Sequence, residues 1–227
     1  MAATVVMQLI EEGLIGLDDP AADYSVSVNR AVTVGAAVGC SFHRTCPAIR
    51  LGEFVAAMRS IQLPGESSTN RRGRHQVDGD PWTRTSIAAV AEEFDPHLLT
   101  AVWERALAQP PWDGTPAWIH GDLMPGNLVV DHGELRAVLD FGECALGNPT
   151  LDLIAGWWVF AGESRHAFRR SANPDEASWN RARGWALALS GAVGALAYYV
   201  DTNPAFSDLA RKTIRNVIAD GEGSMRA

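Results

Sequence analysis

Basic charge and long apolar runs are both scarce in this sequence. Its 227 residues carry 27 acidic and 19 basic side chains, which give a formal net charge of −8 and disfavour nucleic acid as a partner. The longest apolar run, Trp185–Val200, has 16 residues, whereas a membrane span needs roughly 20. The first residues carry Glu11 and Glu12 and no early basic side chain, which is not typical of a secretion signal. We therefore expect a cytoplasmic protein with no membrane partner.

Cysteine is also scarce, and its three positions form no framework. Cys40, Cys46 and Cys144 are an odd number of thiols, which cannot all be paired within one chain. The spacing of Cys40 and Cys46 does not match a zinc knuckle, and no second cysteine pair completes one. We expect three reduced thiols, in keeping with a cytoplasmic location.

The chain divides into a poorly patterned beginning and a well-patterned remainder. Residues 1–48 contain one short apolar run, at 32–39, and we treat them as an N-terminal remnant. Residues 49–220 are expected to form the folded domain, and residues 221–227 form a tail. The segment 62–79 is polar and contains glycine, serine and a cluster of arginines, which indicates a solvated loop.

Helix starts in the domain share one local pattern. An Asp or Asn that can cap free backbone N–H groups is followed by a proline, which has no N–H to lose. This pair begins at Asp80, Asp95, Asn148, Asn173 and Asn203. Together with apolar residues at helical spacing, it predicts helices at 51–61, 80–93, 95–108, 149–161, 174–199 and 203–220. Four tryptophans are then expected in the core rather than in an acceptor pocket: Trp157, Trp158, Trp179 and Trp185.

Short apolar segments between these helices predict a small β region. They lie at 117–120, 128–131 and 135–139. The turn sequence Asp131-His132-Gly133-Glu134 predicts that the last two segments pair as a hairpin. The expected fold class is therefore α+β, mostly helical, with one short β-hairpin.

Oxygen-bearing side chains flank this hairpin in the sequence. His120-Gly121-Asp122 ends the first segment, Asn127 comes just before the hairpin, and Asp140-Phe141-Gly142 follows it. Because the hairpin folds the chain back, we expect Asp140 to approach the loop that carries Asp122 and Asn127. Mg²⁺ prefers oxygen ligands of this kind. Phosphoryl transfer needs little from a protein beyond such a metal ion and an oriented acceptor.

These motifs, with Gly147-Asn148-Pro149 and Asp152-Leu153 after them, resemble those of the aminoglycoside phosphotransferase and choline kinase-like family. The resemblance covers roughly residues 50–220 and implies the large C-terminal lobe of a protein-kinase-like fold. Each triplet alone would be a weak signal, whereas the combined spacing is specific.

The resemblance also implies a role for individual residues. Asp122 resembles the catalytic base, and Asn127 and Asp140 resemble the ligands of Mg²⁺. Three further residues are implied to support the site: His120, Gly142 and Asp152. ATP or GTP would donate the phosphoryl group. A small hydroxylated molecule would accept it, and the acidic balance of the chain permits that molecule to be cationic.

One part of that family's structure has no counterpart in this sequence. The family carries a smaller β-rich lobe, with a nucleotide-covering loop and a lysine, ahead of the matching region. Residues 1–48 are too short for that lobe, and the only lysine, Lys212, lies near the other end of the chain. A cleft that lacks one wall admits water, which weakens its electrostatics. We therefore expect a truncated or divergent phosphotransferase with weak activity.

Two other functions fit parts of the same pattern. The missing lysine also favours a catalytically inactive pseudoenzyme, which binds a ligand or associates with a second copy through its exposed cleft. A metal-dependent hydrolase built on His120, Asp122 and Asp140 is the third alternative. It is the weakest, because the sequence lacks a second histidine at a suitable spacing.

Overall fold

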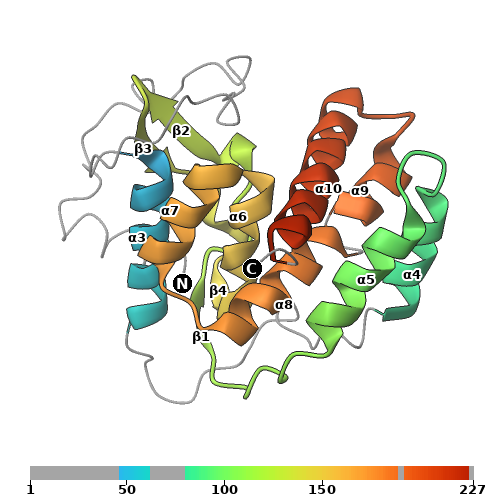
Figure 1. Cartoon of the computed structure of the whole chain (residues 1–227). Helices are drawn as coiled ribbons and strands as arrows, with labels where there is room; N and C mark the ends of the chain where they lie inside the picture. The colour runs from blue at the N-terminus through green and yellow to red at the C-terminus, as the bar shows by residue number, and fades with distance from the viewer. Residues whose placement is uncertain (1–45, 62–79, 189–191, 225–227) are drawn as a thin grey trace.

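The computed structural model describes residues 46–61, 80–188 and 192–224. Over these ranges the chain is mostly helical, with two small sheets set among the helices (Figure 1). This confirms the α+β, mostly helical fold class that the sequence predicts. The apolar run at 32–39, the segment 62–79 with its arginines, and nearly all of the N-terminal remnant lie outside the described residues.

Helix α3 (Pro47–Ser60) and helix α7 (Gly162–Ala172) pack side by side at one end of the molecule (Figure 1). They come close together at Gly52, where a Cβ atom would lie 2.6 Å from the Cβ of Ser171. At the far end, the guanidinium of Arg59 donates to the backbone oxygens of Ala172 and Asn173, at 2.8 and 3.2 Å. These contacts fix α3 against the body of the protein.

Two antiparallel two-stranded sheets carry the loops of interest. Strand β1 (Ala117–Ile119) pairs with β4 (Ala145–Gly147), and strand β2 (Leu128–Asp131) pairs with β3 (Glu134–Val138). The second pair is the predicted hairpin. Strand β4 was not predicted from the sequence.

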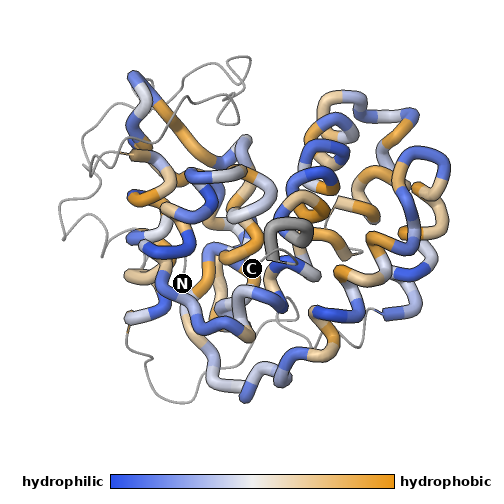
Figure 2. Tube along the Cα trace, viewed as in Figure 1, coloured by the Kyte–Doolittle hydropathy of each residue, from blue (hydrophilic) through white to orange (hydrophobic). Residues whose placement is uncertain are grey.

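Helices α4 (Asp80–Ala89), α5 (Pro96–Leu107), α8 (Glu176–Leu187), α9 (Ala192–Tyr199) and α10 (Pro204–Ser224) form the other half of the molecule. Apolar and polar residues alternate along these helices (Figure 2), as expected for elements with one face in a core. The short helix α6 (Ala155–Trp158) lies between the two halves (Figure 1). The core expectation is confirmed for the fully buried tryptophans Trp157, Trp158 and Trp179, whereas Trp185 is half-buried.

Side-chain caps confirm several predicted helix starts. Asp95 caps α5, Asn148 caps the 3₁₀ segment Pro149–Ile154, and Asn203 caps α10. In each case the side-chain oxygen accepts a backbone N–H from two or three residues further along, at 2.8, 3.0 and 3.1 Å. These bonds satisfy donors that have no partner inside a helix.

Asn173 ends a helix, whereas the sequence predicts that it begins one. It adopts φ 46° and ψ 55° and ends α7, and its N–H bonds back to the oxygen of Arg169. A left-handed residue at this position closes a helix. Asp175 then caps α8 by accepting the N–H of Ser178 at 2.7 Å. The helix expected from residue 174 therefore begins at Glu176, and α7 is a helix that the sequence analysis missed.

The region predicted as one helix over 174–199 contains two helices, α8 and α9. The apolar run at 185–200 contributes the end of α8 and all of α9. Within the described ranges, no helix is both long enough and apolar enough to cross a bilayer.

The two cysteines that the structure describes differ in oxidation state. Cys144 is a free thiol, whereas Cys46 is disulfide-bonded. An odd number of cysteines excludes complete pairing but still allows one pair. The expectation of three reduced thiols is therefore wrong at Cys46.

Candidate active site

Strand β1 leads into the loop that carries Asp122. Gly121 follows the strand with φ at 83°, and a Cβ atom there would lie 2.8 Å from the backbone oxygen of Glu143. The left-handed backbone and the close approach both exclude a side chain, so glycine is needed at this position. Asp122 comes next and is half-buried. We call residues 120–122 the base loop.

Asn127 is bonded directly to Asp122. It ends the short 3₁₀ turn Pro125–Asn127, and its Nδ2 donates to the Oδ2 of Asp122 at 3.0 Å and to the Asp122 backbone oxygen at 2.8 Å. The structure therefore brings these two predicted site residues together. Because the amide nitrogen is used in this way, the Oδ1 of Asn127 is the atom suited to binding a cation.

The ring of His120 is fully buried and is fixed at both nitrogens. Its Nδ1 accepts the backbone N–H of Asp122 at 3.2 Å, and its Nε2 lies 2.9 Å from the backbone oxygen of Leu139. A backbone N–H can only donate and a carbonyl can only accept, so the ring is neutral with its proton on Nε2. Neither nitrogen is left to bind a metal ion, which argues against the hydrolase alternative.

The side chain of Asp152 holds the base loop through two hydrogen bonds. It lies in the 3₁₀ segment before α6, is 2% exposed, and accepts the backbone N–H groups of His120 and Gly121, both at 2.8 Å. Burial raises the pKa of this carboxyl group, and the two N–H donors oppose that rise. The geometry agrees with the supporting position that the sequence analysis expected for Asp152.

The far end of the hairpin returns to the same place. The backbone N–H of Leu139 donates to the backbone oxygen of Asn127 at 2.8 Å. The two ends of the hairpin therefore hold Asn127 beside the residue just before Asp140. Asp140 has φ 60° and ψ 68°, and its Oδ1 accepts the N–H of Gly142 at 3.3 Å. We call residues 139–142 the metal loop. The expected approach of this loop to Asp122 and Asn127 is thus found in its backbone hydrogen bonds.

The donor set is chemically suited to a hard cation. Asp140 is exposed and offers a carboxylate, and Asn127 offers an amide oxygen. One carboxylate or two, completed by phosphates and water, is the usual protein contribution to Mg²⁺. In the described part of the chain, no group of three or more His, Cys, Asp or Glu residues could hold a metal ion.

Two acidic residues that could attract a cationic acceptor, Glu163 and Asp201, are exposed, at the start of α7 and after α9. Lys212 lies on α10, as predicted for a residue in the last helix. Sequence analysis missed Phe54, whose ring contacts both His120 and Phe141. Nothing in its local pattern sets it apart from a core residue of α3.

Several solved structures are similar to this chain. The complex of APH(2")-IIia with GDP and kanamycin is 16% identical, with a TM-score of 0.50 over 76% of this chain and 62% of its own. The macrolide 2'-phosphotransferase MphH from Brachybacterium faecium is 22% identical, with a TM-score of 0.41 over 73% of this chain and 58% of its own. The gentamicin complex of APH(2")-IIa is 13% identical, with a TM-score of 0.46 over 85% and 66%. The chain therefore spans less than two thirds of the length of these structures.

Sequence comparison gives the family. No curated protein sequence matches this chain. A profile described as "Phosphotransferase enzyme family" matches residues 48–185, a stretch that contains the base loop, the hairpin, the metal loop and Asp152. That match covers more than half of the chain, so this protein belongs to the phosphotransferase enzyme family.

Proposed function

We propose that this chain transfers the γ-phosphoryl group of ATP or GTP to a hydroxyl of a small acceptor, with Mg²⁺. The observation that carries the proposal is the position of Asn127. Its side chain donates to Asp122, and its backbone oxygen accepts from Leu139, the residue before Asp140. Family membership and the fold shared with a protein solved with GDP and kanamycin support a nucleotide donor and a hydroxylated acceptor.

In this proposal Asp122 is the base. The acceptor hydroxyl donates a hydrogen bond to the Asp122 carboxylate, which takes the proton as the acceptor oxygen bonds to the γ-phosphorus. The bond from that phosphorus to the β–γ bridging oxygen breaks, and the nucleoside diphosphate leaves with the electron pair. Asn127 orients the carboxylate through its Nδ2. Bound Mg²⁺, held by Asn127 and Asp140, would neutralise charge on the phosphate oxygens.

A coupled assay for nucleoside diphosphate tests this proposal over a panel of hydroxylated and amino-sugar acceptors. Asp122→Ala is expected to abolish turnover and to leave the thermal unfolding midpoint unchanged within a few degrees. Asp131→Ala, in the exposed turn of the hairpin, is the control and should retain wild-type turnover. Undiminished turnover in Asp122→Ala would exclude Asp122 as the base. We expect the wild-type rate to lie below the roughly 1–100 per second of ordinary kinases, because the single lysine of the given sequence, Lys212, lies on α10.

The pseudoenzyme is the second candidate, and the position of the only lysine favours it. Lys212 lies on α10, in the half of the molecule formed by the C-terminal helices. Isothermal titration with Mg·ATP and Mg·GTP separates the two candidates, because an enzyme must bind its donor. Absence of heat and of a thermal shift with both nucleotides would favour the pseudoenzyme. Sedimentation velocity in the same buffers tests self-association through the cleft.

A further inference from the structure

Three rings meet between α3 and the two loops of the candidate site. The ring centroids of His120 and Phe141 lie 4.7 Å apart, and the centroid of Phe54 lies 6.3 Å from each of them. The interplanar angles are 64°, 68° and 77°, so all three contacts are edge-to-face. This geometry places the positive edge of one ring on the negative face of another.

We propose that Phe54 is a positioning residue that sets the base loop and the metal loop relative to each other. The proposal rests on the proposed function, because it needs Asp122 and Asp140 to act together. Phe54 acts through its two ring partners. His120 belongs to the base loop, and Phe141 belongs to the metal loop directly after Asp140.

The orientation of the His120 ring controls the backbone on both sides of it. Nδ1 accepts from the N–H of Asp122, and Nε2 donates to the oxygen of Leu139. These two bonds span the base loop and the metal loop with one side chain. A ring that turns away from this orientation loses both bonds together, because its nitrogens are fixed to one plane. Phe54 contacts that ring edge-to-face and so resists the turn.

The metal loop needs support because its backbone is strained. Asp140 is in the left-handed region, at φ 60°, which is unfavourable for a residue with a side chain. The N–H of Gly142 offsets part of this cost by bonding to the Asp140 carboxylate. The ring of Phe141 contacts both Phe54 and His120, which fixes the residue that directly follows Asp140.

Phe54 is itself held firmly enough to act as a support. Its helix packs along α7, and its neighbours Val55 and Met58 are buried. Phe54 and Phe141 also pack against a small core made by Met58, Trp118 and Leu146. The ring therefore projects from a fixed helix onto two loops that have no regular hydrogen-bond ladder joining them.

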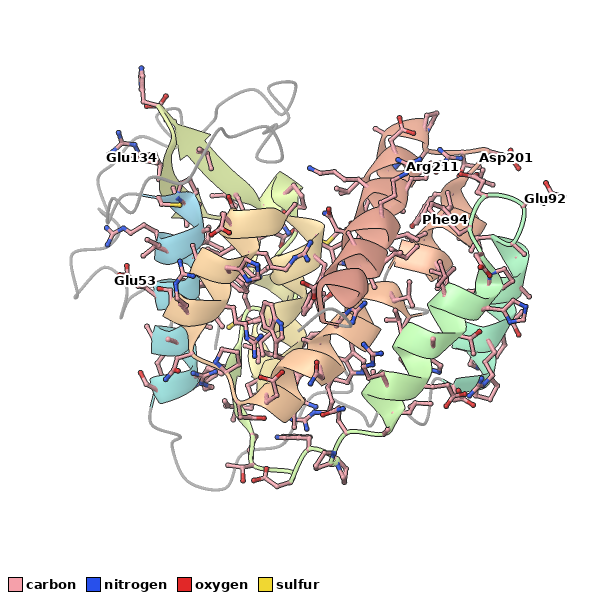
Figure 3. The ribbon with its side chains drawn as sticks, viewed as in Figure 1. Glu53, Glu92, Phe94, Glu134, Asp201 and Arg211 are labelled. Atoms are coloured by element: carbon pink, nitrogen blue, oxygen red, sulfur yellow. The ribbon has the colours of Figure 1, made fainter. Side chains whose placement is uncertain are left out.

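Two substitutions at Phe54 and one matched control test the proposal in the full chain. Phe54→Leu keeps apolar volume but removes the ring edges, whereas Phe54→Tyr keeps the ring. The control is Phe94→Leu, which removes a phenyl ring from the core of the other half. Phe94 contacts Arg215 and lies near Arg211, far from Glu134 at the hairpin (Figure 3).

The first measurement is the tautomer of His120 from long-range ¹H–¹⁵N correlation spectra, together with amide exchange of residues 120–122 and 139–142. Wild type, Phe54→Tyr and Phe94→Leu are expected to show one tautomer, with the proton on Nε2. Phe54→Leu should show a mixture of tautomers and faster exchange in both loops. The proposal is overturned if Phe54→Leu keeps the single tautomer, or if only one of the two loops exchanges faster.

The second measurement is turnover as a function of Mg²⁺ concentration. Phe54→Leu should lower kcat roughly ten- to hundredfold, as expected for a misplacement of about 1 Å, and raise the Mg²⁺ concentration for half-maximal rate, while the KM for the acceptor stays within about twofold. An equal loss in Phe94→Leu would indicate general destabilisation and overturn the assignment. If wild type neither binds Mg·nucleotide nor turns over, the proposed function fails, and the tautomer measurement still decides the role of Phe54.

Discussion

The carboxylate of Asp152 accepts the backbone N–H of His120 at 2.8 Å, although 32 residues separate them in the chain. The second carboxylate oxygen accepts the next N–H, that of Gly121, at the same distance. Two consecutive backbone donors are therefore satisfied by one buried side chain. The base loop is therefore supported from the core as well as by contacts with its own sequence neighbours.

Replacing Asp152 by alanine should lower the free energy of unfolding by at least about 2 kcal/mol. The reason is that two buried N–H groups lose their acceptor, and each unsatisfied donor costs roughly 1–3 kcal/mol. Urea denaturation at pH 7 measures the loss. Asp201→Ala, at an exposed position, is the control and should change little. Equal denaturation midpoints for Asp152→Ala and wild type would contradict the anchoring role.

Gly121→Ala should destabilise the protein by about 1–3 kcal/mol, because its backbone is left-handed and the new Cβ would meet the Glu143 oxygen. Gly126 provides a matched control in the same loop region. A Cβ atom there would meet nothing within 4 Å, so Gly126→Ala should be close to neutral. Thermal unfolding of both variants, side by side, measures the contrast, and similar losses at the two positions would contradict it.

Acid should remove a contribution to stability made by Asp80. Hydrogen bonds from the indole N–H of Trp103, at 2.7 Å, and from Arg84 lower the pKa of the Asp80 carboxyl group. A carboxyl group with a lowered folded-state pKa stabilises the fold above its unfolded pKa of about 4, and that contribution is lost as pH falls through the folded value. Asp80→Asn should therefore be less stable than wild type by about 1 kcal/mol at pH 7.

Urea denaturation of wild type and Asp80→Asn at pH values from 7 to 2 measures this effect. The difference between the two proteins should shrink steadily below about pH 4. A difference that is constant over the whole range would show that the charge of Asp80 contributes nothing.

The thiol of Cys144 should be unreactive at neutral pH. Burial, with a smaller effect from the nearby charge of Asp152, raises its pKa to about 11. Only about one thiol in a thousand is then ionised at pH 8, and the thiolate is the reactive form. Iodoacetamide at pH 8, followed by mass spectrometry of the peptide that contains Cys144, should show labelling far slower than for free cysteine. Rapid labelling in the folded protein would contradict this expectation.

Local sequence predicted the elements that local interactions determine. The hairpin from Leu128 to Val138 follows from two apolar segments and a turn, and the caps of α5 and α10 follow from an Asp or Asn before a proline. Strand β4 was missed because its partner in the described part of the chain is β1, 28 residues earlier. Helix α7 was missed because its residues are largely polar, and it buries Arg165 along with Phe168.

Part of the candidate site was also predictable from local sequence. The hairpin brings Leu139, the residue before Asp140, back to Asn127, so the approach of these two loops could be expected from the sequence. The contact of Phe54 with two loops more than 60 residues away could not, because it depends on how α3 packs against the rest of the molecule. Asn173 shows that a local pattern can also mislead. An Asn before a proline can either begin a helix or end one, and tertiary packing decides which.

Helix α10 lies entirely outside the stretch that matches the family profile, yet it supplies the counter-charge for two arginines of that stretch. Asp220 pairs with Arg165 at 2.8 Å, and its second oxygen lies 3.9 Å from Arg183, with both guanidinium groups almost wholly buried. A protein shortened after α9 would keep every residue of the candidate site, but it would lose this carboxylate and the backbone oxygen of Val217, to which Arg183 donates. We therefore expect the smallest stable unit to be longer than the family-matched segment and to include residue 220.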